Sequence, residues 1–343
     1  MAQTMTPGRG RPAVEEDSVQ PFVKTWFDRR TSAGSDWSRS ELVRLKGSER
    51  ISVVLPAKDE EATVGAIVTA LRRELMEVVP LIDEIVVVDS GSVDATAEVA
   101  ARAGASVVQQ CSVLPRLTDV PGKGEALWKS LLVTEGSIVA FVDADLRDFD
   151  EQFVVGLLGP LLTDPGVGFV KAFYDRPLGN GEVLMPAGGG RVTELVARPL
   201  LNLHWPALAG FVQPLAGEYA ARRSVLEQIP FLSGYGVEIG MLIDVVEEFG
   251  LDVMAQVDLG RRQHRNSDDA ALGRMAAQVH LAMLSRMHRH GRALMTDEPE
   301  TVVTQFAREG AFFVPHDHDI AVSERPPMAD VPEYRRRLAM EGA

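Results

Sequence analysis

Ser137-Ile-Val-Ala-Phe-Val-Asp-Ala-Asp145 is the stretch that decides the fold, because five consecutive apolar residues run directly into two carboxylates. A short apolar run of this kind predicts a strand that is buried on both faces of a sheet. Asp143 and Asp145 follow where the chain leaves that strand, and they supply the hard oxygen ligands that divalent cations prefer. An isolated Asp-x-Asp more often caps a helix, so the assignment depends on the surrounding chain.

Strands and helices alternate around this run through the first half of the chain. Strands are predicted at 51–55, 84–89, 106–109 and 137–143, with helices at 60–76, from Asp94, and at 124–133. This alternation implies an α/β fold with a mostly parallel sheet flanked by helices. Ligands of such sheets bind beyond the carboxyl ends of the strands. We therefore expect 56–60, 89–92 and 143–145 on one rim, where Asp143 and Asp145 form a metal site and not a helix cap.

The second half of the chain is less regular. Strands are predicted at 167–174 and 252–257, and helices from Val192, at 238–249 and at 268–290. Residues 1–20 are predicted to be disordered, 21–50 to form a helical arm, and the tail from 291 to wrap the surface.

Composition excludes several classes of protein. Hydrophobic residues make up 45% of the chain, which is ample for a core, and the net charge of −14 disfavours a nucleic-acid or membrane partner. Cys111 is the only cysteine, so no intrachain disulfide can form and a reducing compartment is expected. No secretory h-region precedes residue 21, and the apolar stretch 195–216 contains charges and prolines. We expect a soluble, cytoplasmic protein.

Two glycine-rich loops precede predicted helices and carry a cation. Lys123 lies between Gly122 and Gly124, where an ammonium and helix N-terminal amides suit a phosphate; a plain exposed loop is the alternative. Gly188-Gly-Gly-Arg-Val-Thr193 repeats this arrangement with Arg191 and Thr193, which suits a phosphorylated carboxylic acid; a flexible hinge is the alternative.

Three further motifs leave alternatives open. Asp89-Ser-Gly-Ser92 can bind a ribose or base, or form an ordinary tight turn. His264 lies in the basic loop 261–266, where it can complete the metal site or remain solvated. Glu238 begins a helix and can bind sugar hydroxyls or stabilise the helix terminus.

With these motifs in hand, the sequence resembles the glucosyl-3-phosphoglycerate synthase / mannosyl-3-phosphoglycerate synthase group of actinobacterial retaining glycosyltransferases. The resemblance spans about 51–290 and rests, in order, on Val54-Leu-Pro-Ala-Lys-Asp-Glu-Glu61, Asp89-Ser-Gly-Ser92, Pro121-Gly-Lys-Gly-Glu-Ala-Leu-Trp128, Gly188-Gly-Gly-Arg-Val-Thr-Glu-Leu-Val-Ala-Arg-Pro-Leu-Leu201, Gln213-Pro-Leu-Ala-Gly-Glu-Tyr-Ala220, Gly234-Tyr-Gly-Val-Glu-Ile-Gly240 and His264-Arg-Asn266.

The resemblance implies a GT-A (Rossmann-like) fold, a UDP- or GDP-sugar donor, D-3-phosphoglycerate as acceptor, Mg²⁺ or Mn²⁺, retention at the anomeric carbon and a homodimer. Carried over by position, the nucleotide sugar would be held by Pro56, Ala57, Glu60, Ser90, Lys123, Asp143, Ala144 and Arg262. The metal would be bound by Asp145 and His264, and the acceptor by Gly190, Arg191, Thr193 and Asn266. Lys123, Glu238 and the carbonyl of Leu215 would lie at the reacting centre.

These roles divide the chain into four segments. Residues 1–50 are the disordered start and helical arm, 51–175 the nucleotide-sugar-binding part, 176–290 the acceptor-binding part and 291–343 a tail. The resemblance departs from the glucosyl enzymes at Lys58-Asp59, where they read Leu-Asn, and at Ala144, where they read Ser. Both positions touch the nucleotide pocket, so they bear on the base and on the sugar. We expect glucose transfer to D-3-phosphoglycerate, with mannose transfer from GDP-mannose or a dual-specificity enzyme as the alternative.

Two other functions fit the sequence less well. A nucleotide-sugar pyrophosphorylase would need a glycine-rich, arginine-containing loop after the first strand, where this chain has Pro56-Ala-Lys-Asp-Glu60. A non-catalytic nucleotide-sugar sensor is disfavoured because every candidate site residue is a chemically competent type. No covalent nucleophile stands out, so we expect front-face displacement in which the metal and Lys123 stabilise the leaving diphosphate.

Overall fold

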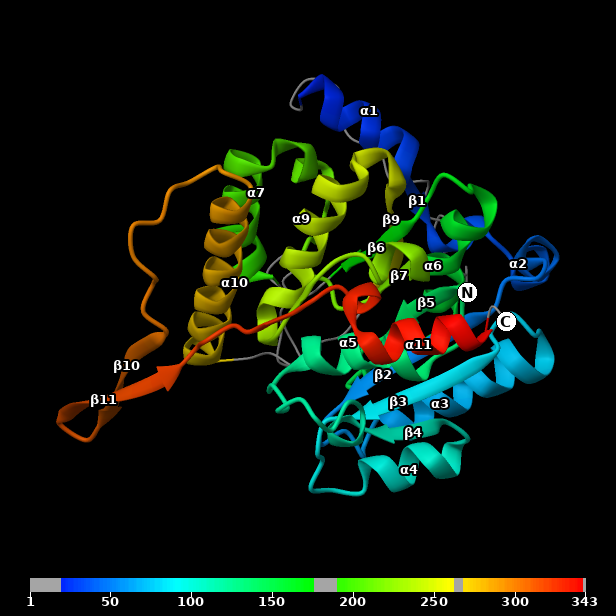
Figure 1. The fold of residues 1–343 in the computed structure, drawn as a ribbon, viewed down its shortest axis with the longest axis horizontal. Helices are drawn as coiled ribbons and strands as arrows, with labels where there is room; N and C mark the ends of the chain where they lie inside the picture. Colours follow the sequence, from blue (N-terminus) through cyan, green and yellow to red (C-terminus); the bar gives the residue numbers. More distant parts are fainter. Residues whose placement is uncertain (1–19, 176–189, 262–267, 342–343) are drawn as a thin grey trace, which may run out of the picture.

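The structure is a computed structural model that describes residues 20–175, 190–261 and 268–341. Its centre is an eight-stranded sheet with the order β1-β9-β6-β7-β5-β2-β3-β4 (Figure 1). Neighbouring strands pair in parallel except at β7, which is antiparallel to β5 and β6. The predicted mostly parallel α/β sheet is confirmed. Its strands are β1 (Thr31–Ala33), β2 (Ile51–Ala57), β3 (Glu84–Asp89), β4 (Ser106–Gln109), β5 (Ile138–Phe141), β6 (Phe169–Asp175), β7 (Tyr219–Arg222) and β9 (Met254–Arg261).

Helices cover both faces of the sheet, so its inner strands are apolar on both sides. Strand β2, for example, gives Val53 and Leu55 to one buried cluster and Val54 to the other. The first cluster includes residues of α2 (Arg39–Lys46), α3 (Val64–Arg72), α4 (Thr96–Ala103) and α6 (Gln152–Thr163). The second includes residues of α1 (Pro21–Arg30), α5 (Lys123–Val133), α7 (Arg198–His204), α8 (Arg223–Leu226), α9 (Val237–Phe249), α10 (Asp269–Arg289) and α11 (Pro332–Glu341).

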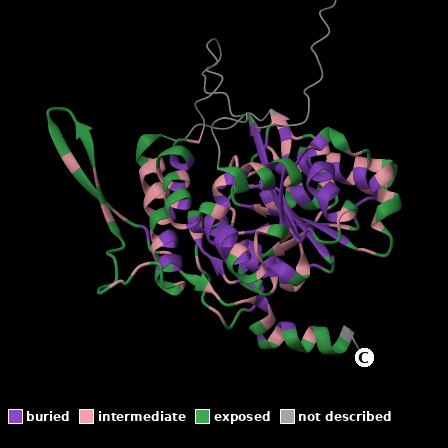
Figure 2. Cartoon of the chain, turned by 90° about the horizontal axis from the view of Figure 1, so that it is seen from above, coloured by how far each residue is buried: buried purple, intermediate pink, exposed green. Residues whose placement is uncertain are grey.

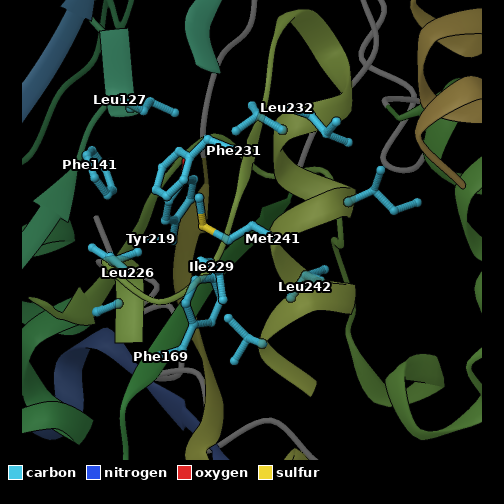
Figure 3. Packing of buried hydrophobic residues seen from close by; sticks show 14 of the residues in the cluster. Leu127, Phe141, Phe169, Tyr219, Leu226, Ile229, Phe231, Leu232, Met241 and Leu242 are labelled. Atoms are coloured by element: carbon cyan, nitrogen blue, oxygen red, sulfur yellow. The ribbon is translucent and has the colours of Figure 1, made fainter. Parts of the chain in front are cut away.

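The second cluster includes residues of the central strands and of α9. Phe141 of β5, Phe169 of β6 and Tyr219 of β7 form an aromatic row on the sheet, facing Met241 and Leu242 of α9 (Figure 3). The Tyr219 ring centroid is 5.1 Å from that of Phe141 and 5.8 Å from that of Phe169. This packing fixes α9 against the centre of the sheet.

Neither β1 nor β7 is among the predicted strands. Strand β1 has three residues in the segment expected to be a helical arm, and it joins the sheet edge beside β9. Strand β7 has four residues, two of them alanines, which favour strands only weakly. The helix expected from Glu60 begins instead at Val64 and continues as a π-helical turn, η2 (Arg73–Val78).

The tail contains regular structure that the sequence does not predict. Strands β10 (Val302–Glu309) and β11 (Phe312–Asp319) form an antiparallel hairpin that extends away from the body and is almost entirely exposed (Figures 1 and 2). Strand β12 (Glu324–Arg325) then pairs with β8 (Phe231–Leu232) before α11. The remaining short elements are η1 (Gly34–Asp36), η3 (Gln110–Ser112), η4 (Thr193–Ala197), η5 (Pro206–Gly210), η6 (Gly234–Gly236), η7 (Leu251–Val253) and η8 (Met328–Asp330).

A buried ion pair connects α9 to α10. Arg286 is fully buried, and its Nε donates to Asp244 Oδ1 at 2.9 Å while its Nη1 donates to Glu324 Oε2 at 2.5 Å. Burial raises the pKa of Asp244, and Arg286 opposes that rise. The pair is well formed, and removing one partner would leave the other charge buried alone.

We expect Arg286→Met to lower the free energy of unfolding by about 3–5 kcal/mol, because it leaves the Asp244 carboxylate buried without its cation. The double variant Arg286→Met/Asp244→Leu should recover much of this loss, since no unpaired charge remains between the helices. Chemical denaturation followed by circular dichroism measures both. Arg335→Ala, which removes an exposed pair with Asp330, is the control. Equal losses for Arg286→Met and Arg335→Ala would contradict the prediction.

Candidate active site at the rim of the sheet

The carboxyl ends of β2, β3 and β5 meet at one edge of the sheet, as expected. Ala57 of β2 lies opposite Asp89 of β3, and Val54 lies opposite Phe141 of β5. The backbone amide of Ser90 donates to the Ala57 carbonyl at 2.9 Å. Pro56, Ala57, Ser90 and the Asp143–Asp145 segment therefore share one rim.

The loops after β2 and β3 are tied to one another. Asp59 has a left-handed backbone (φ 58°), a conformation that asparagine and aspartate adopt more readily than most residues. Its amide donates to Ser92 Oγ at 2.9 Å, and its carboxylate accepts from the Val93 amide at 2.8 Å. Asp59 thus has a structural role, because it ties the loop after β2 to the loop after β3.

Asp89 uses both carboxylate oxygens within the protein. Its Oδ1 accepts from the Ser92 amide at 3.0 Å and from Ser92 Oγ at 2.6 Å, and its Oδ2 accepts from Gln109 Nε2 at 2.7 Å. Asp89 is also buried. Of the two alternatives, the tight turn is the one that these contacts form.

Lys123 is the first residue of α5, and its ammonium lies at the centre of the rim. The Nζ atom is 2.5 Å from Asp143 Oδ1, 3.1 Å from the Gly217 carbonyl and 3.1 Å from Glu238 Oε1. The contacts with Asp143 and Gly217 are hydrogen bonds, and the contact with Glu238 is an ion pair. Burial alone would lower the pKa of Lys123, but Asp143 and Glu238 outweigh it and hold that pKa well above its ordinary value.

Glu238 reaches this ammonium from the first turn of α9 and is largely buried. A carboxylate is favoured at a helix N-terminus by the helix dipole. The helices α5 and α9 therefore both begin at the rim and are joined by the Lys123–Glu238 contact. The sequence predicts either sugar binding or stabilisation of the helix terminus for Glu238, and it does not predict this ion pair.

The glycines at the rim permit close backbone packing. A Cβ at Gly124 would lie 1.8 Å from the Leu232 carbonyl oxygen, and one at Gly122 would lie 2.6 Å from the Gly234 amide nitrogen. The glycines that flank Lys123 thus allow the chain to pack against the segment before α9. The sequence instead predicts that they allow a ligand to approach the backbone. A Cβ at Gly217 would lie 2.1 Å from Asp143 Oδ2, so only glycine lets that carboxylate sit on the Leu215–Gly217 segment.

The loop after β5 displays its two acids differently. Ala144 is buried, Asp143 is half-buried and Asp145 is exposed. Thr63 Oγ1 donates to the Ala144 carbonyl at 2.7 Å and lies 3.4 Å from Glu60 Oε2. These contacts place Glu60 beside the Asp143–Asp145 segment. Carboxylate oxygens such as these are the ligands that a hard divalent cation prefers.

The predicted acceptor residues Gly190, Arg191 and Thr193 lie together where the helical segment η4–α7 begins. Gly190 has a φ of 87°, Thr193 is buried and Arg191 is exposed. The Arg191 guanidinium pairs with the exposed carboxylate of Asp269 at the start of α10. The contact brings the predicted acceptor segment next to the first turn of α10.

Arg262, His264 and Asn266 lie outside the described residues, so their predicted roles stay predictions. Among the residues that the structure does describe, no three histidine, cysteine or acidic side chains form a metal-binding group. Within the same residues, no helix is both long and apolar enough to cross a membrane.

One charged residue near the rim is absent from the sequence predictions. Lys171 of β6 is buried, and its Nζ lies 4.4 Å from the centroid of the Tyr219 ring. The available signal was a lysine inside the apolar run Phe169-Val-Lys-Ala-Phe173.

Comparisons with known proteins agree with this geometry. The model of Glycosyl transferase family 2 matches residues 52–201. The chain is 44% identical over 305 residues to glucosyl-3-phosphoglycerate synthase from Petrotoga mobilis, covering 88% of this chain and 93% of that protein.

Two solved structures extend the likeness to three dimensions. The mannosyl-3-phosphoglycerate synthase from Rubrobacter xylanophilus superposes with a TM-score of 0.83 at 42% identity, covering 90% of this chain and 99% of that one. The glucosyl-3-phosphoglycerate synthase from Mycobacterium tuberculosis, in complex with Mn²⁺, UDP-glucose and phosphoglyceric acid, gives 0.73 at 44% identity, with 85% and 94% covered. The chain is a GT-A-type glycosyltransferase and belongs to the glucosyl-3-phosphoglycerate synthase family.

Proposed function

We propose that this glycosyltransferase moves glucose from UDP-glucose to D-3-phosphoglycerate, with retention at the anomeric carbon and with Mg²⁺ or Mn²⁺ as its metal. The observation that carries the proposal is the partly buried cluster of Lys123, Asp143 and Glu238 on the rim, which holds a local cation within an acidic protein. The donor, acceptor and metal are those bound together in the relative from Mycobacterium tuberculosis. Mannose transfer from GDP-mannose is the second candidate, because the mannosyl relative is also highly similar.

The residues divide the work between donor and acceptor. Asp145, with His264, holds the divalent ion, which when bound neutralises charge on the leaving diphosphate. Pro56, Ala57, Glu60, Ser90, Asp143, Ala144 and Arg262 hold the nucleotide sugar. Lys123 donates to the diphosphate as charge develops there, which stabilises the leaving group.

The acceptor is held on the other side of the rim. Gly190, Arg191, Thr193 and Asn266 bind phosphoglycerate, and the Leu215 carbonyl faces the reacting centre. Leu215 lies two positions before Gly217. The Gly217 carbonyl accepts from Lys123, and the Asp143 carboxylate occupies the space that a side chain at 217 would need. The nucleotide sugar and phosphoglycerate thus meet at the Leu215–Gly217 segment, which has little room to move. A rigid segment between the two substrates helps to hold them in the geometry that the transfer needs.

We expect nucleotide release to be fastest with UDP-glucose, to require D-3-phosphoglycerate and a divalent cation, and to stop in excess EDTA. Parallel assays with UDP-glucose, GDP-glucose and GDP-mannose measure this. Faster release with GDP-mannose would favour the mannosyl function. Full turnover in excess EDTA would contradict the metal assignment, and donor binding without any release would indicate a sensor.

Arg191→Ala should raise the KM for phosphoglycerate by roughly ten- to a hundredfold or more, because a lost charge-assisted phosphate contact costs about 1.5–3 kcal/mol. Donor affinity, measured by calorimetry, should stay nearly constant. Asp269→Ala is the matched control, since it removes the same exposed ion pair and keeps the guanidinium. An equal fall in donor affinity would show that Arg191 does not serve the acceptor.

A homodimer formed through the hairpin is part of the proposal. Phe306, Phe312 and Phe313 are 65–76% exposed on β10 and β11, and a two-stranded hairpin alone is marginally stable in water. Its described hydrogen bonds to the body run through Gln305, to Ala270 and Arg274 of α10. A second copy of the chain is the occupant that fits, because the net charge of −14 disfavours nucleic acid and anionic membrane.

Phe306→Asp/Phe313→Asp, at two residues that share one face of the hairpin, should convert the dimer to a monomer of unchanged secondary structure, because two buried charges would disrupt an apolar contact. Light scattering after size exclusion measures the mass. Met340→Asp, an exposed apolar residue of α11, should leave the dimer intact. A monomeric unaltered protein would contradict the dimer, and a dimeric double variant would contradict the role of the hairpin.

A cytoplasmic location suits this function. Cys111 is the single cysteine and is exposed, which is compatible with a reducing compartment.

A further inference from the structure

Lys171 is a buried charge that the reaction as described does not use. Its side chain is 1% exposed, and its Nζ has no hydrogen-bond partner among the residues that the structure describes. The Tyr219 ring beneath the ammonium offers a cation–π contact at 4.4 Å, which compensates only part of the lost hydration. A methionine of similar length would avoid the desolvation cost, so the fold alone does not account for a lysine here.

Lys171 lies two residue layers below the rim cluster. It is opposite Tyr219 in the sheet, and Tyr219 is opposite Phe141, two positions before Asp143. The Tyr219 ring therefore has the Lys171 ammonium at 4.4 Å and the Lys123 ammonium at 6.0 Å. The titratable and charged groups around Lys171 are Lys123 on α5, Asp143 after β5, Glu218 and Tyr219 on β7 and Glu238 on α9.

Glu238 exerts the strongest attraction on the Lys171 ammonium. Burial lowers the pKa of Lys171 to about 7; Glu238 opposes that shift, Lys123 adds to it, and Glu218 and Asp143 oppose it. In the structure described, Lys123 already serves Glu238 at 3.1 Å. Lys171 thus interacts electrostatically with Glu238, whose ion-pair partner in this structure is Lys123.

The proposed function creates a need for a second cation. Lys123 makes hydrogen bonds to Asp143 and to the Gly217 carbonyl and an ion pair with Glu238, so turning its ammonium to a diphosphate weakens at least one of these contacts. If it leaves Glu238, the carboxylate remains largely buried without a counter-charge, which is costly. Lys171 is the nearby buried cation whose ammonium is not committed to any hydrogen bond within the described chain.

We propose, on the basis of the proposed function, that Lys171 is a positioning residue: it takes over Glu238 as counter-cation when Lys123 turns to the donor diphosphate. Glu238 then stays ionised and in place throughout the transfer. A cation that takes up this role at pH 8 must be protonated, so donor-site binding should draw a proton from solvent.

Calorimetry of UDP with Mg²⁺ at pH 8, in two buffers of different ionisation enthalpy, tests the transfer of charge. The nucleotide phosphates are deprotonated at that pH. We expect net proton uptake on binding, because a Lys171 pKa of about 7 leaves this amine mostly neutral at pH 8 and the contact with Glu238 raises that pKa. Lys171→Met should bind UDP without this uptake. If UDP does not bind, the proposed function fails; if UDP binds the unaltered protein without proton uptake, only the role of Lys171 fails.

Kinetics and stability separate positioning from a structural role. Lys171→Met should lower kcat at least about tenfold, because Glu238 loses its replacement cation, while the KM for phosphoglycerate stays within about twofold. Its melting temperature should hold or rise, since a buried amine without a hydrogen-bond partner in the described chain is removed. Unchanged kcat, or a loss of kcat that only follows a loss of folded protein, would overturn the proposal.

Lys129→Met is the matched control. Lys129 is also fully buried, but its ammonium is 3.2 Å from Glu125 Oε1, donates to the Gln110 carbonyl at 3.0 Å and pairs with Asp119. Its loss should reduce stability and leave kcat per folded molecule and the proton uptake unchanged. If Lys171→Met does not fold, the proton uptake of the unaltered protein decides the question.

Discussion

The sharing of one ammonium between two carboxylates is the interaction on which the site depends. Lys123 begins α5, Asp143 follows β5 and Glu238 begins α9, so their contacts bring three elements to one point. Neither carboxylate could remain ionised and largely buried there without a cation. The close approach also needs glycine at 217, where any side chain would occupy the space of the Asp143 carboxylate. Charge and backbone packing therefore constrain the same few atoms.

This arrangement explains how an acidic protein can handle anionic substrates. A net charge of −14 repels phosphates at long range, so attraction has to arise from cations held close to the binding position. Lys123 is such a cation, and Asp143 and Glu238 raise its pKa enough to keep it charged despite burial. The same carboxylates also compete with a substrate for its donors. A site built this way binds phosphate only by exchanging one set of partners for another.

Sequence patterns predicted the elements whose physical signal is local. Strands β2 and β3 were predictable because a strand buried on both faces is a continuous apolar run, and β3 and β4 have the bounds predicted for them. Strands β1 and β7 are short edge or antiparallel segments without such a run, and the exposed β10–β11 hairpin has no buried face to impose alternation. Their formation depends on pairing partners far away in the chain.

The same distinction applies to the site. Lys123, Asp143 and Glu238 could each be selected from their loops, because glycines and strand ends mark positions where ligands approach. Their mutual contact could not be predicted, since 115 residues separate the lysine from the glutamate, the difference between positions 238 and 123. Lys171 was missed because a lone lysine in a strand pattern is most often a solvated residue. Its burial arises only when β7 and α9 cover it.

The ion pairs of this fold fall into two kinds, and the difference follows from how completely each charge is satisfied. Arg286 meets Asp244 with two nitrogens and Glu324 with a third, and Lys129 has a carboxylate and a carbonyl within 3.2 Å. Such closed networks hold helices in place and have no reason to rearrange. At the rim, one cation serves two carboxylates while a second buried cation has no hydrogen bond in the described chain. An incompletely satisfied network has more than one arrangement of similar energy, and a ligand charge can select among them. The fixed pairs thus hold α9 rigid, while the charges at its first turn keep the capacity to change partners.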